Sequence, residues 1–303
     1  MLQILHGTNF PFMKYRRAAY VFSSLFVLAT AAWLIVKGPR ESVDFTGGTL
    51  LQVRTIPALR ADAVRSALDG AGLHGAELQQ MTGAAHDEFL IRTQTDSVNV
   101  FPRVKAAIEG RAAGAKVEFR NLSTVGPKVG GELRQKAVWA ILSSLGVILL
   151  YVGWRYEFKF ALGGVVALLH DVFVTLGCLM FTGREVSLTV IAALLTIAGY
   201  SINDTIVVFD RIRERSKMLR KETHSRVMDI AVNETLSRTV ITAFTVFLTA
   251  LALFIWGGEV LRDFSFAMLV GTVFGTYSSV YVASALALDI WIWLDRRKGI
   301  QAE

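Results

Sequence analysis

Residues 198–215 read AGYSINDTIVVFDRIRER. The first part of this stretch closes an apolar run that begins at Val186, and the last part is a row of arginines. A run of this kind approaches the length of about 20 apolar residues that a helix needs to cross a bilayer. Asn203 and Asp204 lie inside it, where an ionisable side chain is costly. The stretch therefore predicts a membrane helix that carries an acid and ends in a basic loop.

The rest of the chain is apolar in the same way. Of its 303 residues, 53% are hydrophobic and 19% are charged, and the mean hydropathy is +0.45. Soluble domains are usually about 25% charged, and here the apolar excess is concentrated in long runs. These runs predict six transmembrane helices, over Ala18–Val36, Ala137–Gly153, Phe160–Phe181, Val186–Phe209, Thr239–Trp256 and Phe264–Trp293.

Several kinds of chemistry are disfavoured by the composition. Cys178 is the single cysteine, so neither an intramolecular disulfide nor a cysteine-based metal site is expected. The histidines show no metal-ligand spacing, and no P-loop or dinucleotide-binding turn is present. No grouping of nucleophile, base and oxyanion donors suggests an enzyme. We expect no cofactor, and any work that the protein does must draw on an energy source other than its own ATP site.

The basic residues predict the orientation in the membrane. They cluster around 14–17, 155–159, 211–226 and 296–298. The two opposite short loops hold one arginine each, Arg184 and Arg262. The positive-inside rule then places both termini in the cytoplasm. Orientation and contact with anionic lipid account for the net charge of +7, so we expect no nucleic-acid partner.

The first apolar run has an alternative interpretation as a signal peptide, because Ala29-Thr30-Ala31 resembles a cleavage site. Its continuation through Val36 and the even number of helices favour an uncleaved anchor. The expected domains are an N-terminus with the first helix (1–36), an extracytoplasmic domain (37–135), a five-helix domain (136–295) with a basic loop at 210–235, and a cytoplasmic tail (296–303).

The segment between the first two helices predicts a small α+β domain. Its expected strands are Val43–Thr55, Glu77–Met81, Glu88–Thr95 and Lys116–Asn121, and its expected helices are Pro57–Ala71 and Ser97–Arg111. The order β-α-β-β-α-β is typical of a ferredoxin-like sandwich. Because fold alone gives no activity, a folded spacer and a docking surface for another protein both remain open.

Asp204 is the strongest candidate for function. It precedes Arg211 by seven residues, which puts it roughly 10 Å inside the helix end. An acid at that depth must pair, reach water or take up a proton; a structural hydrogen bond between helices is the alternative. Other polar residues share its helix, namely Thr189, Thr196, Asn203 and Asp210 at steps of seven, and Ser201.

The fifth helix carries a matching polar stripe, made of Thr235, Arg238, Thr242, Thr245 and Thr249. A stripe of this kind suggests a face turned toward polar partners or water. We interpret Arg238 as a candidate partner for Asp204, since both helices enter from the same side. The alternative is an interfacial arginine that extends into the lipid headgroups.

Two further helices have informative patterns. In the third, Asp171 follows His170 and lies in line with Thr175, Cys178 and Thr182, so it is a second and weaker candidate for proton transfer or a buried hydrogen-bonded residue. The sixth has a small residue at every fourth position, namely Ala267, Gly271, Gly275, Ser279, Ala283 and Ala287. This stripe predicts a face against which another helix packs closely.

Taken together, several stretches resemble the SecD/SecF family of bacterial protein-export subunits, and within it the smaller SecF subunit. The matching stretches are Asp44-Phe45-Thr46-Gly47-Gly48, Val125-Gly126-Pro127, His170-Asp171-Val172, residues 199–214 (GYSINDTIVVFDRIRE) and residues 233–239 (NETLSRT). They occur in order over nearly the whole chain.

The resemblance implies a subunit of a proton-driven transporter superfamily in the bacterial cytoplasmic membrane. It implies SecD, the SecYEG channel and a translocating preprotein as partners, with YajC as a further candidate. It also implies that the proton-motive force assists translocation after the ATP-driven stage, with Asp204 and Arg238 taking part in proton conduction. The rivals are half of a proton-coupled transporter for a small molecule or ion, and a passive scaffold of the translocon.

Overall fold

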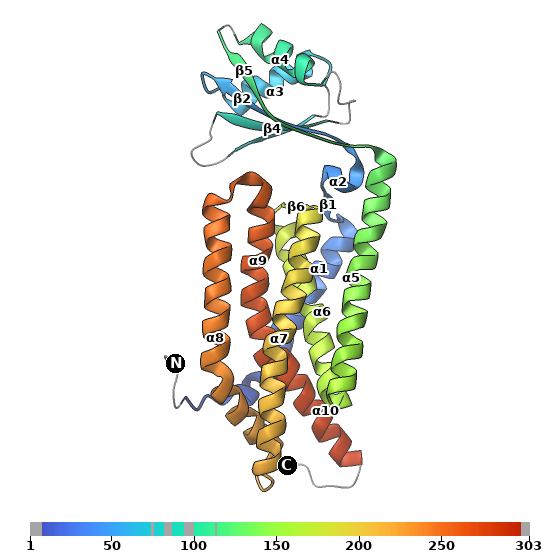
Figure 1. The fold of residues 1–303 in the computed structure, drawn as a ribbon, viewed down its shortest axis with the longest axis vertical. Coiled ribbons are helices and arrows are strands. Elements are labelled where there is room, and N and C mark those ends of the chain that lie inside the picture. The colour runs from blue at the N-terminus through green and yellow to red at the C-terminus, as the bar shows by residue number, and fades with distance from the viewer. Residues whose placement is uncertain (1–7, 74–75, 82–86, 94–99, 113, 298–303) are drawn as a thin grey trace. The chain divides into compact units, whose positions relative to one another are not determined.

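The structure is a computed structural model that describes residues 8–73, 76–81, 87–93, 100–112 and 114–297. The chain divides into two compact units (Figure 1). The first combines Met1–Arg40 with Trp139–Glu303, and the second is Glu41–Val138. The first unit holds the apolar helices, and the second holds most of the segment expected to form an α+β domain at 37–135.

Six helices in the described part of the chain are long and apolar enough to cross a membrane, which confirms the predicted fold class. Five of them are α1 (Arg16–Val36), α5 (Pro127–Arg155), α6 (Phe158–Phe181), α7 (Leu188–Met218) and α8 (His224–Trp256). The sixth is built from α9 (Gly258–Ser278), η3 (Ser279–Ala283) and α10 (Ser284–Arg297). The short turn η1 (Phe12–Tyr15) precedes α1.

Local sequence explains where the two longest helices begin. The Ser187 hydroxyl accepts a hydrogen bond from the Val190 N–H at the start of α7, and the Thr223 hydroxyl accepts one from the Arg226 N–H at the start of α8. Side-chain caps of this kind satisfy N–H groups that a helix start leaves unpaired. Both helices extend past the apolar runs of the sequence into charged segments at the basic end of the bundle.

The last helix contains a π-helical turn, η3, between α9 and α10. Its small residues pack against other helices, as predicted. A Cβ added at Gly271 would lie 2.3 Å from Ile197 of α7, and one added at Gly163 of α6 would lie 2.7 Å from the Ala283 carbonyl oxygen. Ala283 itself is fully buried. The small residues therefore let the backbones of α6 and the last helix come close together, and they make room for the Ile197 side chain of α7.

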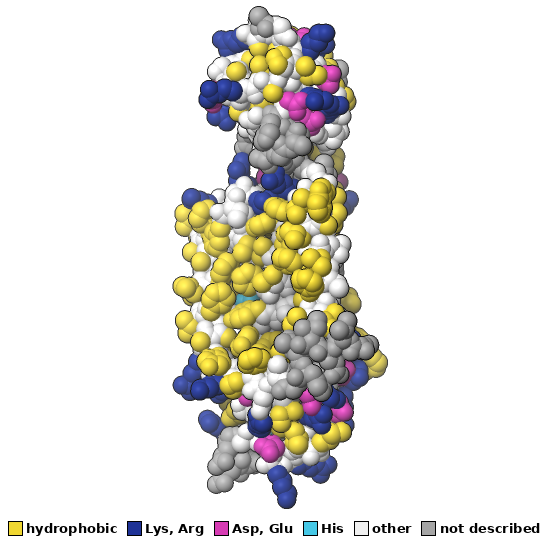
Figure 2. All heavy atoms as spheres, turned by 90° about the vertical axis from the view of Figure 1, so that its left-hand side faces the viewer, with side chains coloured by type: hydrophobic (Ala, Val, Ile, Leu, Met, Phe, Trp, Pro, Cys, Tyr) yellow, Lys and Arg dark blue, Asp and Glu magenta, His cyan; other side chains and the backbone are white. Residues whose placement is uncertain are grey.

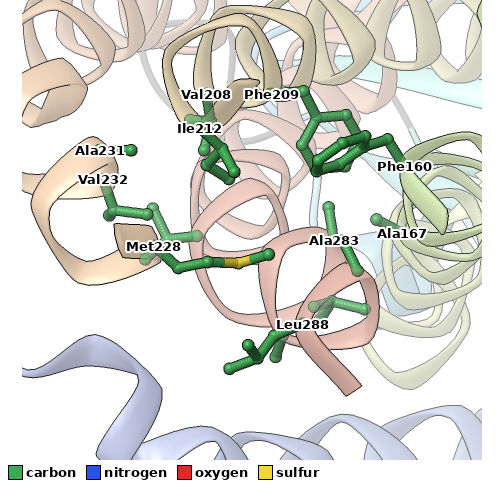
Figure 3. Close-up of a cluster of buried hydrophobic side chains, with 14 of the residues drawn as sticks. Phe160, Ala167, Val208, Phe209, Ile212, Met228, Ala231, Val232, Ala283 and Leu288 are labelled. Carbon is green, nitrogen blue, oxygen red and sulfur yellow. The ribbon is translucent and has the colours of Figure 1, made fainter. Parts of the chain in front are cut away.

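The first unit has a core of buried hydrophobic side chains (Figure 3). Most of its buried side chains come from α6, α7, α8 and the last helix, and they include Phe160 and Ala167 of α6, Phe209 and Ile212 of α7, Met228 and Val232 of α8, and Leu288 of α10. The ring centroids of Phe160 and Phe209 are 5.0 Å apart. Interdigitated apolar side chains hold these four helices together.

Outside this core, the bundle exposes large apolar side chains. Trp154 of α5 is 87% exposed, and Ile35 of α1 is 86% exposed. On the face of the bundle seen in Figure 2, hydrophobic side chains form a broad band, and lysines and arginines gather beyond it. Apolar faces this extensive are costly in water and favourable against lipid tails, so the chain is a multi-pass membrane protein.

The second unit is a four-stranded antiparallel sheet covered by two helices. Its elements are β2 (Gly48–Ile56), α3 (Ala61–Gly70), β3 (Glu77–Gln80), β4 (Glu88–Thr93), α4 (Val100–Arg111) and β5 (Lys116–Val125). The strand order is β3-β4-β2-β5, which is the arrangement of a ferredoxin-like sandwich. Alternate residues of β2, such as Leu51 and Val53, point inward and pack with Phe89 of β4.

Parts of this unit correct the sequence prediction. The helix expected over Pro57–Ala71 begins only at Ala61 and ends at Gly70. Residues 43–47 were expected to begin a strand, but Val43–Thr46 form the short helix α2, because the Ser42 hydroxyl accepts a hydrogen bond from the Asp44 N–H and starts a helical turn. Gly47 then adopts a φ of 73°, a conformation that favours glycine and ends the turn before β2. The expected strand at 116–121 is longer than predicted and continues to Val125. Two strands of two residues, β1 (Arg40–Glu41) and β6 (Glu185–Val186), complete the fold.

Candidate functional site

Asp204 is buried in α7, with 2% of its surface exposed. Its Oδ1 accepts a long hydrogen bond of 3.5 Å from the Thr242 hydroxyl of α8. Its Oδ2 is buried and has no hydrogen-bond partner among the described residues, although the Tyr200 side chain lies beside the carboxylate. Burying a carboxylate without full pairing costs free energy, and taking up a proton removes that cost because it removes the charge. The site is therefore suited to hold a proton.

Arg238 lies on α8 one turn before Thr242, and its side chain is exposed. Its charge attracts the Asp204 carboxylate, but no salt bridge within 4.0 Å joins the two among the described residues. The Thr242 hydroxyl also lies 3.0 Å from the Arg238 carbonyl oxygen of its own helix, so the Asp204 carboxylate and that oxygen compete for its one proton.

The polar stripe of α8 divides into a buried and an exposed part. Thr235 is buried and donates to the carbonyl oxygen of Ala231. Thr245 and Thr249 are exposed, and each donates to a carbonyl oxygen of its own helix. The outer part of the stripe, together with Arg238, therefore faces away from the described chain.

The polar side of α7 divides in the same way. Thr196 and Asn203 are exposed, and Thr196 donates to the Ala192 carbonyl oxygen at 2.8 Å. Ser201 and Asp204 are buried. The steps of seven in the sequence thus mark an outward face, and the residues one helical turn apart at 201 and 204 mark the inward one.

Asp171 lies at the centre of a second polar cluster, where three helices meet. It is fully buried in α6, and its Oδ1 is 2.9 Å from Nδ1 of His170. Its Oδ2 accepts hydrogen bonds from the hydroxyls of Ser201 on α7 and Ser278 on α9, the latter at 2.7 Å. Ser278 was not among the predicted site residues, although it lies beside Ser279 of the small-residue stripe. Unlike Asp204, Asp171 is well supplied with hydrogen-bond donors.

The remaining polar residues of the third predicted helix do not join this cluster. Thr175 is buried, and its hydroxyl has no hydrogen-bond partner among the described residues. Cys178 is partly buried, and Thr182 donates to the Cys178 carbonyl oxygen at 2.7 Å. The polar line seen in the sequence therefore reaches the Asp171 cluster only at Asp171 itself.

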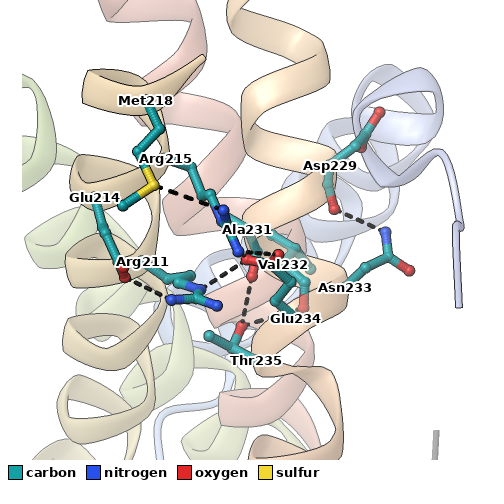
Figure 4. A network of polar contacts seen from close by, with 10 residues as sticks. All are labelled: Arg211, Glu214, Arg215, Met218, Asp229, Ala231, Val232, Asn233, Glu234 and Thr235. Atoms are coloured by element: carbon teal, nitrogen blue, oxygen red, sulfur yellow. Dashed lines mark hydrogen bonds and ion pairs between the residues drawn. The ribbon is translucent and has the colours of Figure 1, made fainter. Parts of the chain in front are cut away.

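Glu234 of α8 joins the basic ends of α7 and α8 (Figure 4). Its Oε2 lies 2.7 Å from Nε of Arg211, and its Oε1 lies 2.6 Å from an amino group of Arg215. Glu214 also pairs with Arg211, at 2.6 Å. From sequence, these arginines predict orientation and contact with anionic lipid. Their pairing with Glu234 shows that they also connect two helices.

Asn233, the neighbour of Glu234, fastens the N-terminal segment to α8. Its side-chain amide accepts from the Phe10 N–H and donates to the Phe10 carbonyl oxygen, each at 2.9 Å. Asp229, one turn earlier, accepts from the Met13 N–H at 2.9 Å. Asn233 belongs to one of the stretches that resemble the SecD/SecF family, but no sequence pattern predicts this contact.

The comparisons with protein families place these features in context. The model described as "Protein export membrane protein SecD/SecF, C-terminal" matches residues 104–293, and the model described as "SecD/SecF GG Motif" matches residues 32–55. A protein translocase subunit SecF from Vibrio alginolyticus is 43% identical over 306 residues, covering 100% of this chain and 97% of the relative. A SecF from Escherichia coli O157:H7 is 38% identical, covering 95% of this chain and 90% of that one.

Solved structures agree with the match to the SecD/SecF family. The crystal structure of SecDF, a translocon-associated membrane protein from Thermus thermophilus, matches 96% of this chain with a TM-score of 0.85 at 39% identity. A crystal structure of SecDF in a super-membrane-facing form matches 97% of this chain with a TM-score of 0.72 at 39% identity. The present chain corresponds to 39% and 40% of those two chains, so each solved chain extends well beyond it.

Proposed function

This chain belongs to the SecD/SecF family as a SecF subunit, a transport component rather than an enzyme, and we propose that it uses the proton-motive force to assist preprotein translocation through SecYEG at a late, ATP-independent stage. The observation that carries the proposal is Asp204. It is a buried acid in a membrane helix, with one oxygen lacking a hydrogen-bond partner among the described residues. Such residues in membrane proteins mark ion and proton pathways.

The proposed proton site is the region between α7 and α8. Asp204 and Thr242 form its inner part, and Arg238, Asn203, Thr196 and Thr245 line the exposed part. Since these polar side chains face away from the described chain, we assign the space beside them to the SecD partner. The SecDF chain of Thermus thermophilus, in which the matched part is only 39% of the whole, supports this assignment.

Protonation of Asp204 would change the forces across this region. The charged carboxylate attracts Arg238 and accepts from Thr242, whereas the neutral acid loses the attraction and gains a donor. Moving one elementary charge through the membrane field supplies about 2.3 kcal/mol per 100 mV. This is enough to bias two helix arrangements that differ by a few kcal/mol. The α+β domain would transmit the change by binding a preprotein outside the membrane.

The proposal includes an orientation of the chain in the membrane, which rests on the positive-inside rule. The basic end of the bundle, which carries Arg211 and Arg215, lies in the cytoplasm together with both termini, in the bacterial inner membrane. SecYEG and YajC are the further partners. Asp171 would act as a secondary proton site, supported by its position on a buried cluster that shares α7 with Asp204.

The test is export by inverted membrane vesicles under an imposed proton gradient. Asp204→Asn keeps the volume and one acceptor but cannot ionise, so we expect the gradient-dependent part of export to be lost while the complex with SecD remains. The matched control is Asp210→Asn on the same helix, because Asp210 is half exposed and lies 3.8 Å from Arg155. Full gradient-dependent export by Asp204→Asn would refute the proposal and favour a passive scaffold. Proton flux triggered by a small solute without SecD would favour a small-molecule transporter.

A further inference from the structure

Tyr200 of α7 carries a buried hydroxyl group one helical turn before Asp204. It lies near the middle of the apolar run, well inside the helix that begins at Leu188 and roughly 16 Å before Arg211. Tyrosines of membrane proteins gather at the headgroup level, where the hydroxyl reaches water. The Tyr200 hydroxyl is too deep for that role, and it has no hydrogen-bond partner among the described residues. Because a buried tyrosine hydroxyl usually has a partner, its surroundings are informative.

Oxygen atoms of three side chains lie close to this hydroxyl group. They belong to Asp204, to Thr242 of α8 and to Thr276 of α9, and each interacts with the phenol. None of the three completes a hydrogen bond to it in the described part of the chain. The Asp204 Oδ2 atom is buried and unpaired in the same way. Two neighbouring side chains thus each hold an unpaired oxygen, and a rotation of either can join them.

The donors and acceptors around the phenol are constrained. The Thr276 hydroxyl donates to the Thr272 carbonyl oxygen at 2.9 Å, so its oxygen is left to accept from Tyr200. The charged carboxylate of Asp204 can also only accept. Tyr200 has one proton, and these two acceptors compete for it. Protonation of Asp204 ends the competition, because the neutral acid becomes a donor.

We propose that Tyr200 is a positioning residue that transmits the charge state of Asp204 to α9. While Asp204 is charged, the phenol donates to its Oδ2, because a charged acceptor makes the stronger hydrogen bond. Once Asp204 is neutral, its new O–H group donates to the phenol oxygen, and the phenol donates to Thr276. No proton leaves Tyr200 in this exchange, since its O–H bond only turns from one acceptor to the other.

The part of α9 that receives this hydrogen bond also contacts the second acid. Ser278, two residues after Thr276, donates to Asp171 at 2.7 Å, and the π-helical turn η3 begins at the next residue. Single π-turns occur frequently at functional sites. A hydrogen bond gained or lost at Thr276 therefore acts on a segment with a distorted backbone. This inference rests on the proposed function, because it requires that Asp204 changes its protonation state.

The test is infrared difference spectroscopy between high and low pH, on the full chain reconstituted in lipid with its SecD partner. A protonated carboxyl group has a C=O stretching band that moves to higher frequency when the group loses a hydrogen bond. The Asp204 band is identified by its loss in Asp204→Asn. We expect it to move to higher frequency in Tyr200→Phe, which keeps the ring and removes only the hydroxyl. A band that stays in place in Tyr200→Phe would overturn the proposal.

The matched control is Tyr277→Phe in α9. The Tyr277 hydroxyl lies 3.1 Å from the Ser23 hydroxyl and donates to the Ala19 carbonyl oxygen at 3.1 Å, so its partners are on α1. This variant loses the same phenol group and should leave the Asp204 band in place. An equal shift in both variants would mean that losing any membrane phenol moves the band, and it would overturn the assignment to Tyr200.

Export under an imposed proton gradient tests the link to α9. We expect Tyr200→Phe and Thr276→Val each to lower gradient-dependent export by about three- to tenfold, the ratio for one net hydrogen bond. The double variant should lose no more than either single variant, because both remove the same interaction. Thr272→Val is the control, since it also removes a hydroxyl that donates within α9, here at 2.7 Å to the Met268 carbonyl oxygen, and it should export normally. Losses that multiply in the double variant would overturn the link.

Failure of this inference can be told apart from failure of the proposed function. If no carboxyl band is lost in Asp204→Asn, Asp204 does not change its protonation state, and the proposed function fails together with the role of Tyr200. If Asp204→Asn loses both the band and gradient-dependent export while Tyr200→Phe matches wild type in both, the proposed function stands and only the role of Tyr200 is refuted.

Discussion

The adjacent glycines of α6, Gly163 and Gly164, should respond in opposite directions to the same substitution. A Cβ at Gly163 would lie 2.7 Å from the Ala283 carbonyl oxygen and 3.3 Å from the Ala287 nitrogen, both of which are backbone atoms. A Cβ at Gly164 would meet the Phe209 ring at 3.5 Å, an ordinary van der Waals distance. Gly163→Ala therefore forces α6 and α10 apart, whereas Gly164→Ala fills space between α6 and α7.

The magnitude follows from the difference between the two variants. Each gains about 0.5–1 kcal/mol of helix propensity when glycine is replaced by alanine. Overpacking costs about 1–3 kcal/mol, and only Gly163→Ala incurs it. Since the propensity gain is common to both, we expect the unfolding free energy of Gly163→Ala to be lower than that of Gly164→Ala by about 1–3 kcal/mol.

The measurement is reversible unfolding of the purified full chain in mixed micelles, with denaturing detergent as the variable and tryptophan fluorescence as the signal. Gly146→Ala serves as a baseline, because a Cβ at Gly146 meets no atom within 4 Å. Gly164→Ala should be at least as stable as that baseline. If Gly163→Ala unfolded together with Gly164→Ala, the close approach of α6 to the last helix would not be a packing constraint.

Three further predictions concern polar groups. Replacing Asn233 with alanine leaves the Phe10 N–H and carbonyl oxygen without their side-chain partner, which should lower the stability of this contact by about 1–3 kcal/mol. Proteolysis near the N-terminus should therefore accelerate. A hydrogen bond from Arg54 lowers the pKa of Asp87. The stabilisation from this hydrogen bond is therefore complete above the ordinary Asp pKa of 3.8 and is lost as the pH falls through the lowered pKa of Asp87. Hydrogen exchange of β4 should differ between wild type and Arg54→Gln above pH 3.8, and the difference should disappear below the lowered pKa. Asp171→Asn keeps acceptor and donor capacity and should fold, whereas Asp171→Leu should lower stability by several kcal/mol, measured by detergent unfolding.

The membrane fold was largely predictable from sequence, because long apolar runs have few structural outcomes. The order of strands and helices in the α+β domain was predictable for a related reason, since alternation and helical periodicity distinguish the two kinds of element. The start of the first strand was not, because the cap formed by Ser42 depends on a single side-chain hydrogen bond. The π-helical turn at Ser279–Ala283 was not predictable either, since it results from packing between helices.

The candidate site also has residues that the sequence predicts and residues that only the packing of the helices reveals. Asp204 and Asp171 stand out in sequence because acids are rare in membrane helices. Which neighbours reach them depends on helix rotation, which the sequence leaves open. The steps of seven singled out Thr196 and Asn203, and the structure places both outward. Ser278 could not be distinguished from other small residues before the helices were packed together.

The arrangement of α7 explains how one helix can serve both acids. Ser201 donates to Asp171, and Asp204 follows one turn later toward α8. Gly275 allows the last helix to approach Ser201 closely, with a Cβ at that position falling 3.3 Å from the Ser201 Cβ. In a closely packed contact, small displacements are not absorbed gradually, and alternative packings are discrete. A movement of α7 that changed the surroundings of Asp204 would therefore also break or remake the Ser201 hydrogen bond. The two acids are then linked by rigid displacement of one helix, with no need for a chain of hydrogen bonds between them.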